Sequence, residues 1–108
     1  MTTTTLEILH ISLASDGPAV VVRLEGDLDF GSGPRLAERL GEVVDAGSQV
    51  VVDLAGVGFV DPAGLAALLA ASKAAARRGA SFVLRAPQRA VARLLATTGA
   101  DRLVTVEW

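Results

Sequence analysis

The chain has 108 residues, 51% of them hydrophobic and 20% charged, which predicts one packed domain and excludes a disordered chain. The absence of cysteine excludes disulfides, zinc–thiolate sites and a cysteine nucleophile, and the single histidine leaves little for imidazole chemistry. A net charge of −2, with one lysine in the whole sequence, provides no basic patch for nucleic acid. We therefore expect the partner to be another protein or a small ligand.

The N-terminal sequence predicts neither export nor insertion into a membrane. Residues 1–7 lack the basic segment and the uninterrupted apolar run of a signal peptide. The longest apolar stretch, Ala63–Ala71, is about half of the roughly 20 residues that a membrane-spanning helix needs. We expect a cytoplasmic protein with a flexible tail over residues 1–5 and a domain over residues 6–106.

Two strands open the predicted fold as a hairpin. The first covers Leu6–Leu13 and stops at the turn-forming residues 14–18, and the second, rich in β-branched residues, covers Ala19–Glu25. The short connection between them favours antiparallel pairing. Residues 26–34 contain glycines, aspartates and a proline and are predicted to form a loop.

A helix and a central strand come next. The helix is predicted from Pro34 to Gly47, because apolar residues recur at i, i+4, i+7 and i+8 from Leu36. The short run Val50–Leu54 is apolar apart from one aspartate, which is the pattern of a strand buried on both faces. This strand should therefore lie in the middle of the sheet.

The rest of the chain alternates helices and strands. A second helix is predicted from Pro62 to Arg78, a strand over Ser81–Arg85, a third helix from Pro87 to Gly99 and a last strand over Leu103–Val106. The order β-β-α-β-α-β-α-β predicts a single α/β domain. Its sheet should be mixed and mostly parallel, with about five strands, three helices and right-handed crossovers.

The sequence offers little for catalysis, and we expect the protein not to be an enzyme. His10 lies in the first strand without an obvious Ser, Asp or Glu constellation, so a structural or solvent-facing histidine is the simpler interpretation. A receiver-type phosphoacceptor at Asp53 or Asp61 would need a lysine late in the chain, whereas the only lysine, Lys73, falls in the middle of the second helix. We expect neither a metal nor a cofactor.

The glycine-rich segment Gly31-Ser32-Gly33 leaves two interpretations open. Its backbone amides could be presented to an anion before the first helix, as in a nucleotide-binding protein. Turn geometry before a proline is also a sufficient reason for these glycines. No Gly-Lys-Ser or Gly-Lys-Thr sequence, typical of a phosphate-binding loop, occurs in the chain.

The start of the second helix is the most informative point of the sequence. Asp61 is a good N-cap and Pro62 suits the first helical position. The helix N-terminus carries a partial positive charge, so the site suits a phosphate switch, but a cap followed by proline and a small Gly64 for close packing explains the same residues. Residue types alone favour the simple cap.

The second helix is also unusually rich in alanine. At 100° per residue, its inward side is predicted to consist of Leu65, Leu68, Leu69, Ser72 and Ala76. The outward stripe would then consist of Ala66, Ala67, Ala70, Ala71 and Ala74. Such a stripe would let another surface approach closely, although the high helix propensity of alanine is an equally good explanation.

Four segments in this order resemble a known family. They are Gly-Asp-Leu-Asp at 26–29, Val-Val-Asp-Leu at 51–54, Phe-Val-Asp-Pro-Ala-Gly-Leu at 59–65 and Thr-Gly at 98–99. With the predicted element order, the chain resembles the STAS domain family of anti-sigma factor antagonists, also called anti-anti-sigma factors, from Leu6 to Val106. The first segment is similar to the family's Gly-Glu-Leu-Asp after the second strand.

The resemblance implies a protein-binding function in partner switching. Such an antagonist docks on an anti-sigma factor that is also a kinase and thereby releases the sigma factor for transcription. Phosphorylation of a Ser or Thr directly after the motif's Asp stops the docking, because negative charge enters a close interface. The expected partner-binding residues are Asp27, Asp29, Asp61, Pro62, Ala63, Gly64, Leu65, Ala67 and Ala71.

The chain departs from the family at the phosphorylated position. Pro62 stands there, Ala63 follows, and no Ser, Thr or Tyr occurs between Gln49 and Ala71. The usual switch should therefore be absent, and Ser32 is the nearest alternative hydroxyl. We expect a constitutively competent antagonist-like binding module; the alternative is a STAS subunit of another assembly, such as an ABC-type lipid transporter or a stress-signalling scaffold.

Overall fold

The computed structural model describes residues 9–29 and 31–108, and it confirms the predicted α/β class and element order. The elements are β1 (His10–Asp16), β2 (Ala19–Leu28), α1 (Gly33–Asp45), β3 (Gln49–Val60), α2 (Pro62–Arg77), β4 (Phe82–Arg85), α3 (Arg89–Thr98), the 3-10 turn η1 (Ala100–Arg102) and β5 (Thr105–Glu107). The predicted tail and the first residues of the predicted opening strand lie outside the described residues.

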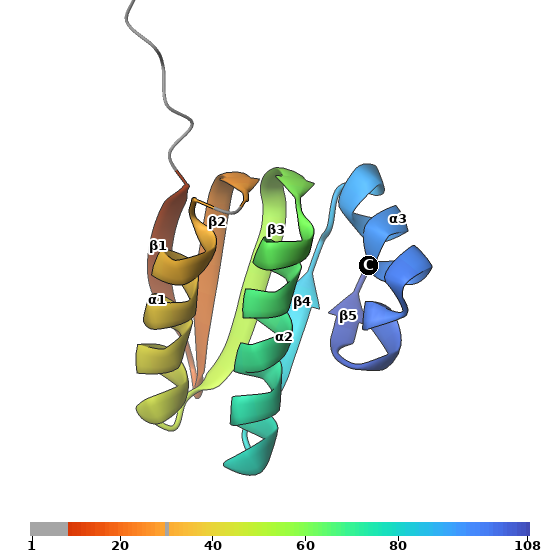
Figure 1. Ribbon diagram of the computed structural model, residues 1–108. Coiled ribbons are helices and arrows are strands. Elements are labelled where there is room, and N and C mark those ends of the chain that lie inside the picture. The colour runs from red at the N-terminus through yellow and green to blue at the C-terminus, as the bar shows by residue number, and fades with distance from the viewer. Residues whose placement is uncertain (1–8, 30) are drawn as a thin grey trace, which may run out of the picture.

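The sheet has five strands in the order β1-β2-β3-β4-β5, so neighbours in space are also neighbours in sequence (Figure 1). β1 pairs antiparallel with β2, and every other pair is parallel. This arrangement is the mixed, mostly parallel sheet that the element order predicts. The carboxyl ends of β2 and β3 consequently lie next to each other, at the same end of the strands.

β2 and β3 both extend further than the sequence predicts. β2 continues through the expected loop to Leu28, and β3 continues past Leu54 to Val60. The two strands stay paired because register shifts absorb their mismatch, with Gly26 at a φ of +115° beside the second shift. Gly26, one of the glycines that predict a loop, therefore lies within the ladder beside a register shift.

α1 and α2 lie side by side across one face of the sheet, and α3 packs against β3 and η1 (Figure 1). The core lies between the helices and this face, and strand residues of the face, such as Val22, Val52 and Leu84, are fully buried there. The alternate strand residues, among them Arg23 and Arg85, point to the opposite face. No helix of the described residues is long and apolar enough to cross a membrane.

Candidate functional site

The site predicted from sequence lies where β2 and β3 end and α2 begins. Asp27 stands opposite Phe59 in the parallel ladder, and Leu28 stands opposite Val60. The Asp61 amide donates a hydrogen bond of 3.0 Å to the Leu28 carbonyl oxygen, which continues the pairing up to the first turn of α2. The two strands thereby bring residues from distant parts of the sequence to one place.

α2 begins with a complete N-cap. The Asp61 carboxylate accepts a hydrogen bond of 2.8 Å from the Gly64 amide, and Pro62 occupies the first turn, as the sequence predicts. Gly64 is required because a Cβ at this position would lie 2.6 Å from both the Cγ and the carbonyl oxygen of Leu28. The start of α2 is thus held tightly against the end of β2.

The segment before α1 is built around the carboxylate of Asp29. Its Oδ1 accepts hydrogen bonds from the amides of Gly31 (3.0 Å) and Ser32 (3.1 Å), and its carbonyl oxygen accepts one from Gly33 (2.9 Å). The Ser32 hydroxyl lies 3.2 Å from the Asp27 carbonyl oxygen and accepts the Asp29 amide at 2.9 Å. These amides already have acceptors within the chain, which supports the turn interpretation of the glycines and not the anion cradle.

The structure separates the predicted partner-binding residues into exposed and buried ones. Pro62 and Ala63 are exposed, and the half-buried members are Asp27, Asp29, Asp61 and Ala67. Gly64 and Leu65 are buried, because Gly64 packs on Leu28 and the Leu65 side chain joins the core. Those two positions therefore support the surface from beneath and offer no surface to a partner.

The predicted outward stripe of α2 is wrong at its centre. Ala71 is only 8% exposed, and Ala67 and Ala74 are half-buried against the core. These small residues line a narrow groove between α1 and α2, together with Ala37 and Gly41 of α1. Periodicity alone gives α2 one inward side, whereas in the structure α2 packs on α1 as well as on the sheet.

Phe59 was missed among the site residues. Its side chain is 52% exposed, stands opposite Asp27 in the ladder and lines a pocket of about 240 Å³ with Ala90 and Leu94 of α3. The sequence shows an aromatic residue two positions before a helix cap, but only the structure shows that its side chain is exposed. We use the name helix-start surface for Asp27, Asp29, Phe59, Asp61, Pro62 and Ala63.

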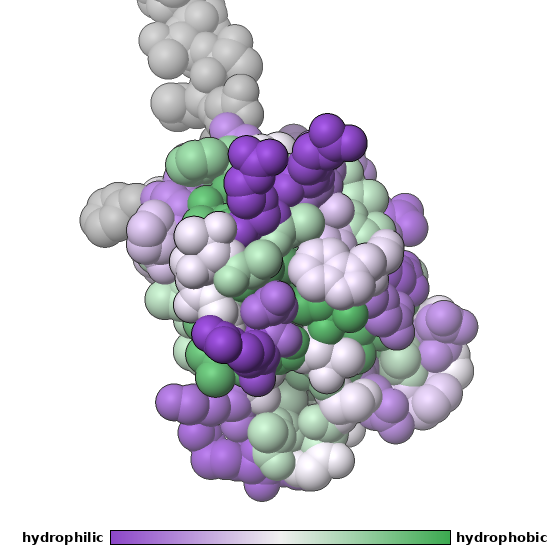
Figure 2. All heavy atoms as spheres, turned by 90° about the vertical axis from the view of Figure 1, so that its right-hand side faces the viewer, coloured by the Kyte–Doolittle hydropathy of each residue, from purple (hydrophilic) through white to green (hydrophobic). Residues whose placement is uncertain are grey.

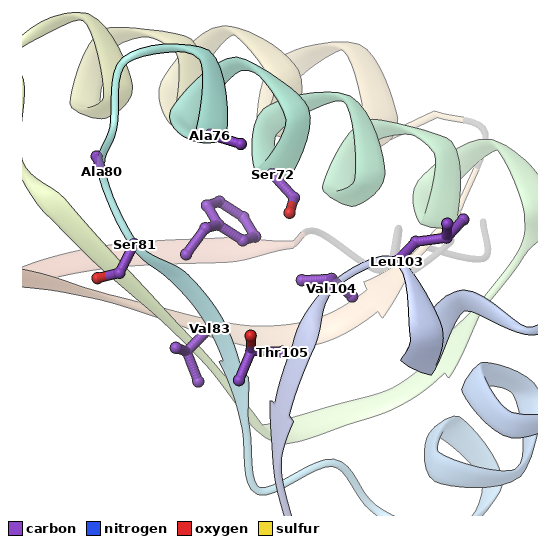
Figure 3. Close-up of a pocket in the computed structure, with 9 residues that line it drawn as sticks. Ser72, Ala76, Ala80, Ser81, Val83, Leu103, Val104 and Thr105 are labelled. Carbon is purple, nitrogen blue, oxygen red and sulfur yellow. The ribbon is translucent and has the colours of Figure 1, made fainter.

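A second hollow runs along the other side of α2. An open apolar groove of about 500 Å³ is lined by Ala66, Leu69, Ala70, Ser72, Lys73, Ala76 and Leu103. Leu103, which is 71% exposed, connects this groove to a smaller pocket of about 260 Å³ between α2, β4 and β5, where Ser72 and Val104 lie on opposite sides (Figure 3). Figure 2, seen from the side of α3 and β5, shows hydrophobic atoms in the middle of this face among hydrophilic ones.

Asp53 lies on the open face of the sheet, away from the helix-start surface. Its carboxylate accepts a hydrogen bond of 2.9 Å from the Ala55 amide, and its Oδ2 is 3.5 Å from Nε of Arg23 and 3.5 Å from Nη2 of Arg85. The Ala55 hydrogen bond and the two guanidinium groups lower the pKa of Asp53, against a smaller opposing effect of burial. This position is a structural ion-pair centre within the sheet.

Within residues 9–29 and 31–108, the structure places no group of three or more His, Asp or Glu side chains that could hold a metal ion. His10 is exposed at the start of β1, and Lys73 is exposed on α2 at the margin of the apolar groove. Neither residue belongs to the helix-start surface. What the site presents is an exposed, mostly apolar helix start flanked by carboxylates, a surface suited to contact with another protein.

Solved structures with the same fold include bacterial anti-sigma factor antagonists. An anti-sigma factor antagonist from Mycobacterium paratuberculosis is 25% identical, with a TM-score of 0.85 over 93% of this chain and 86% of that chain. A variant of RsbS from Moorella thermoacetica is 26% identical, with a TM-score of 0.72 over 89% of this chain and 84% of that chain. SpoIIAA, a Bacillus anti-sigma factor antagonist, is in its unphosphorylated form 17% identical, with a TM-score of 0.77 over 92% of this chain and 89% of that chain.

The sequence also matches a family description over nearly its whole length. Residues 11–105 match the family described as "Mlab, STAS domain". The match spans the sheet from β1 to the start of β5, and includes both strand ends and the helix cap that form the helix-start surface. On this match, and with the fold that the structure shows, the chain belongs to the STAS domain family.

Proposed function

We propose that this protein is a protein-binding module of the anti-sigma factor antagonist kind, which docks on an anti-sigma factor with kinase activity and so releases a sigma factor. The observation that carries the proposal is the exposed helix start, Pro62 and Ala63, beside the carboxylates of Asp27 and Asp61. The antagonist from Mycobacterium paratuberculosis and the Moorella RsbS variant support it, as relatives of about one quarter identity.

The chemistry of the helix-start surface suits docking and not catalysis. The hydroxyl of Ser32 is engaged with the backbone of Asp27 and Asp29, and the Asp61 carboxylate is engaged in the cap of α2. What remains for a partner is apolar surface, from Phe59, Pro62 and Ala63, with negative charge at its side. A partner with a complementary apolar patch and basic side chains would fit this surface.

The proposed module lacks the usual phosphorylation switch. Pro62 follows the capping aspartate and has no hydroxyl to accept a phosphate. A phosphate here would add about 1.5 to 2 negative charges beside the carboxylates of Asp27 and Asp61, and their repulsion and the desolvation cost would oppose docking. Without an acceptor, this chain would always be competent to bind. Binding would then be controlled by the abundance of this protein or by changes in the partner.

The first experiment is an affinity purification of the full chain at native abundance from its own cells, with co-purifying chains identified by mass spectrometry. Recovery of an anti-sigma factor with a kinase-like ATPase domain supports the proposal. Recovery of transporter subunits in its place overturns it and favours the alternative, a STAS subunit of an ABC-type lipid transporter or another assembly. The matching family description names Mlab and no anti-sigma factor, which is the reason to retain that alternative.

The second experiment locates the docking surface on the recovered partner. Ala63→Arg places a large cation on the exposed helix start and should weaken binding at least tenfold, because an interface core tolerates a new charge poorly. The control Ala46→Arg makes the same change at the exposed end of α1 and should bind like the parent chain. Equal affinities for the parent and the Ala63→Arg chain would exclude this surface.

The third experiment tests the loss of the switch. Pro62→Ser provides a hydroxyl at the first turn of α2 and leaves the Asp61 cap in place. With the recovered kinase and ATP, the variant should take up phosphate and lose affinity, and the parent chain should do neither. A variant that stays unphosphorylated would contradict the assignment of position 62 as the family's acceptor site.

A further inference from the structure

The edge of the sheet at β1 is unusually open. β1 is seven residues long, and all of them are exposed except Ile11, which is partly buried. It pairs with β2 along one side, and among the strands that the structure describes none lies along its other side (Figure 1). Leu13, in the middle of the strand, has 45% of its surface exposed.

This edge lacks the features by which proteins usually protect an exposed strand. Residues 11–15 are Ile-Ser-Leu-Ala-Ser, with no charge and no proline, and their pairing with β2 is continuous, without a bulge. The opposite edge of the sheet differs, because β5 has only three residues and one of them is Glu107. A long edge strand whose five central residues carry no charge is a template for pairing with another strand.

We propose that β1 pairs antiparallel with β1 of a second copy of this chain, with the two-fold axis passing through Leu13. In this register all seven residues of the strand find a partner: Leu13 faces Leu13, Ser12 faces Ala14, Ile11 faces Ser15 and His10 faces Asp16. The two five-stranded sheets would join into one continuous sheet. This interface lies on an edge that the proposed docking function does not use.

Hydrogen-bond complementarity at the two ends of the strand selects this register. At each end of the joined strands, His10 of one copy meets the Asp16 carboxylate of the other and can donate a hydrogen bond to it. His10 also stands opposite Glu25 of its own β2, so its ring would lie between two carboxylates. A shift by two residues in either direction removes both His–Asp pairs.

The apolar side chains of β1 are also placed for this pairing. Ile11 and Leu13 stand opposite the core residues Leu24 and Val22, so they point to the helix face of the sheet. At the two-fold axis the Leu13 side chains of both copies would touch and cover the surface that each exposes alone. The small Ser12 and Ala14 on the other face cause no steric conflict.

The first measurement is the molar mass of the full chain by sedimentation equilibrium, from about 10 μM to about 1 mM, where weak self-association becomes visible. A concentration-dependent dimer is expected. A chain that stays monomeric up to the highest concentration overturns the proposal. This measurement needs no partner protein, so its failure leaves the proposed docking function untouched, and failure of that function does not affect the dimer.

The register is tested by disulfide cross-linking. The chain contains no cysteine of its own, so an introduced cysteine is the only thiol present. Leu13→Cys should form a disulfide-linked dimer under mild oxidation, since residues directly opposite in antiparallel strands have Cα atoms about 4.5–5.5 Å apart, within disulfide range. His10→Cys is the matched control and should not link to itself, because its two copies would lie about 20 Å apart. Mixing His10→Cys with Asp16→Cys chains should restore the cross-link.

Substitutions should separate this edge from the other exposed leucine. Leu13→Lys places like charges together at the two-fold axis and should raise the dimer dissociation constant at least tenfold, whereas Leu103→Lys, on the far side of the molecule, should leave it unchanged. If Leu103→Lys abolishes the dimer and Leu13→Lys does not, the contact lies at the groove beside α2 and the β1 proposal is wrong.

Discussion

Gly64 is the residue on which the close approach of α2 to β2 depends. In α2 its backbone is helical, so alanine would normally be the better residue there. A Cβ, however, would stand 2.6 Å from the carbonyl oxygen of Leu28, which is backbone and cannot move aside without shifting β2. The small residue at this point is therefore a steric requirement of the site.

Gly64→Ala should lower the free energy of unfolding by about 1–3 kcal/mol, because the added methyl group forces the helix start away from β2. The matched control is Gly41→Ala in α1, where an added Cβ meets nothing within 4 Å. That substitution should raise the free energy of unfolding by about 0.5–1 kcal/mol through helix propensity. Urea unfolding measures the free energy of unfolding of each variant. If both substitutions change it in the same direction, the steric argument is contradicted.

Asp53 provides a stability term that depends on pH. The Ala55 amide and the guanidinium groups of Arg85 and Arg23 lower its pKa in the folded state below that of the unfolded chain. The ionised carboxylate therefore stabilises the fold above the ordinary aspartate range, and this contribution is lost as the pH falls through the folded-state pKa.

Asp53→Asn should destabilise the chain near neutral pH by about 1 kcal/mol, through loss of charge-assisted hydrogen bonds. The difference from the parent chain should begin to shrink as the pH falls below about 4, where the unfolded parent chain takes up the proton first, and should vanish only below the lower pKa of Asp53 in the folded state. Urea midpoints from pH 7 to pH 3 measure this convergence. The exposed Asp45→Asn is the control and should differ little from the parent throughout; a constant deficit for Asp53→Asn would refute the linkage.

Single residues at the helix start could be predicted from sequence, and single residues along the helix could not. Asp61 and Pro62 are local signals, because a cap and a first-turn proline depend only on adjacent backbone groups. The burial of Ala71 depends on α1, which is folded from residues far away in the sequence. Periodicity locates an apolar stripe on a helix but does not show whether it meets a sheet, a second helix or solvent.

At the scale of elements, the contact between α1 and α2 explains the composition of α2. Small side chains at Ala67, Ala71 and Ala74 let the helices approach closely, and Ala37 faces them from α1. The alanine richness that suggested an interface with another protein is thus largely an internal feature. Three of the exposed alanines of α2, Ala66, Ala70 and Ala76, line the apolar groove.

Ala71→Glu tests this packing directly. It should lower the free energy of unfolding by at least about 2 kcal/mol, because a carboxylate would be buried against α1 without a partner. Ala70→Glu makes the same change at the adjacent, exposed position and should stay within about 0.5 kcal/mol of the parent. Thermal unfolding of both variants is the measurement. Similar stabilities of the Ala71→Glu and Ala70→Glu variants would contradict the close packing of α2 on α1.

The types of the elements could be predicted better than their limits. Each helix had an apolar period and a start or stop residue in the sequence, and the ends of α1 and α2 fall within two residues of the prediction. The extensions of β2 and β3 were missed, because Gly26, Gly56 and Gly58 are ordinary loop signals. Only the pairing of the two strands reveals that these glycines sit within a ladder.

For the whole molecule, one continuous core implies one cooperative unit. Residues from every helix and from β2, β3 and β4 join a single cluster of buried side chains. Unfolding should therefore follow a single transition, with coincident midpoints from far-ultraviolet circular dichroism and calorimetry. Trp108, the only tryptophan, is 68% exposed, so its fluorescence should change little in that transition. Two separate calorimetric transitions would contradict a single core.

The overall architecture was predictable because it follows from the order in which strand-like and helix-like hydrophobic patterns alternate along the chain. A hairpin followed by strand–helix alternation has few compact solutions, and the right-handed crossover rule removes most of the rest. The outer surface was less predictable, since exposure at Phe59 and Leu103 depends on how far neighbouring elements extend. The start of α2 and its cap could thus be predicted from the sequence, while the exposure of the side chains around it needed the folded structure.

The strand order carries a consequence for biosynthesis. Because the spatial order β1-β2-β3-β4-β5 is also the order in the chain, no strand has to be inserted between two strands that are already paired. During translation the N-terminal hairpin can form first, and each later strand, with the helix before it, can then add to a finished edge. A nascent chain that has left the ribosome as far as β3 could already contain the paired ends of β2 and β3. The sheet would then be completed by adding strands at one edge only.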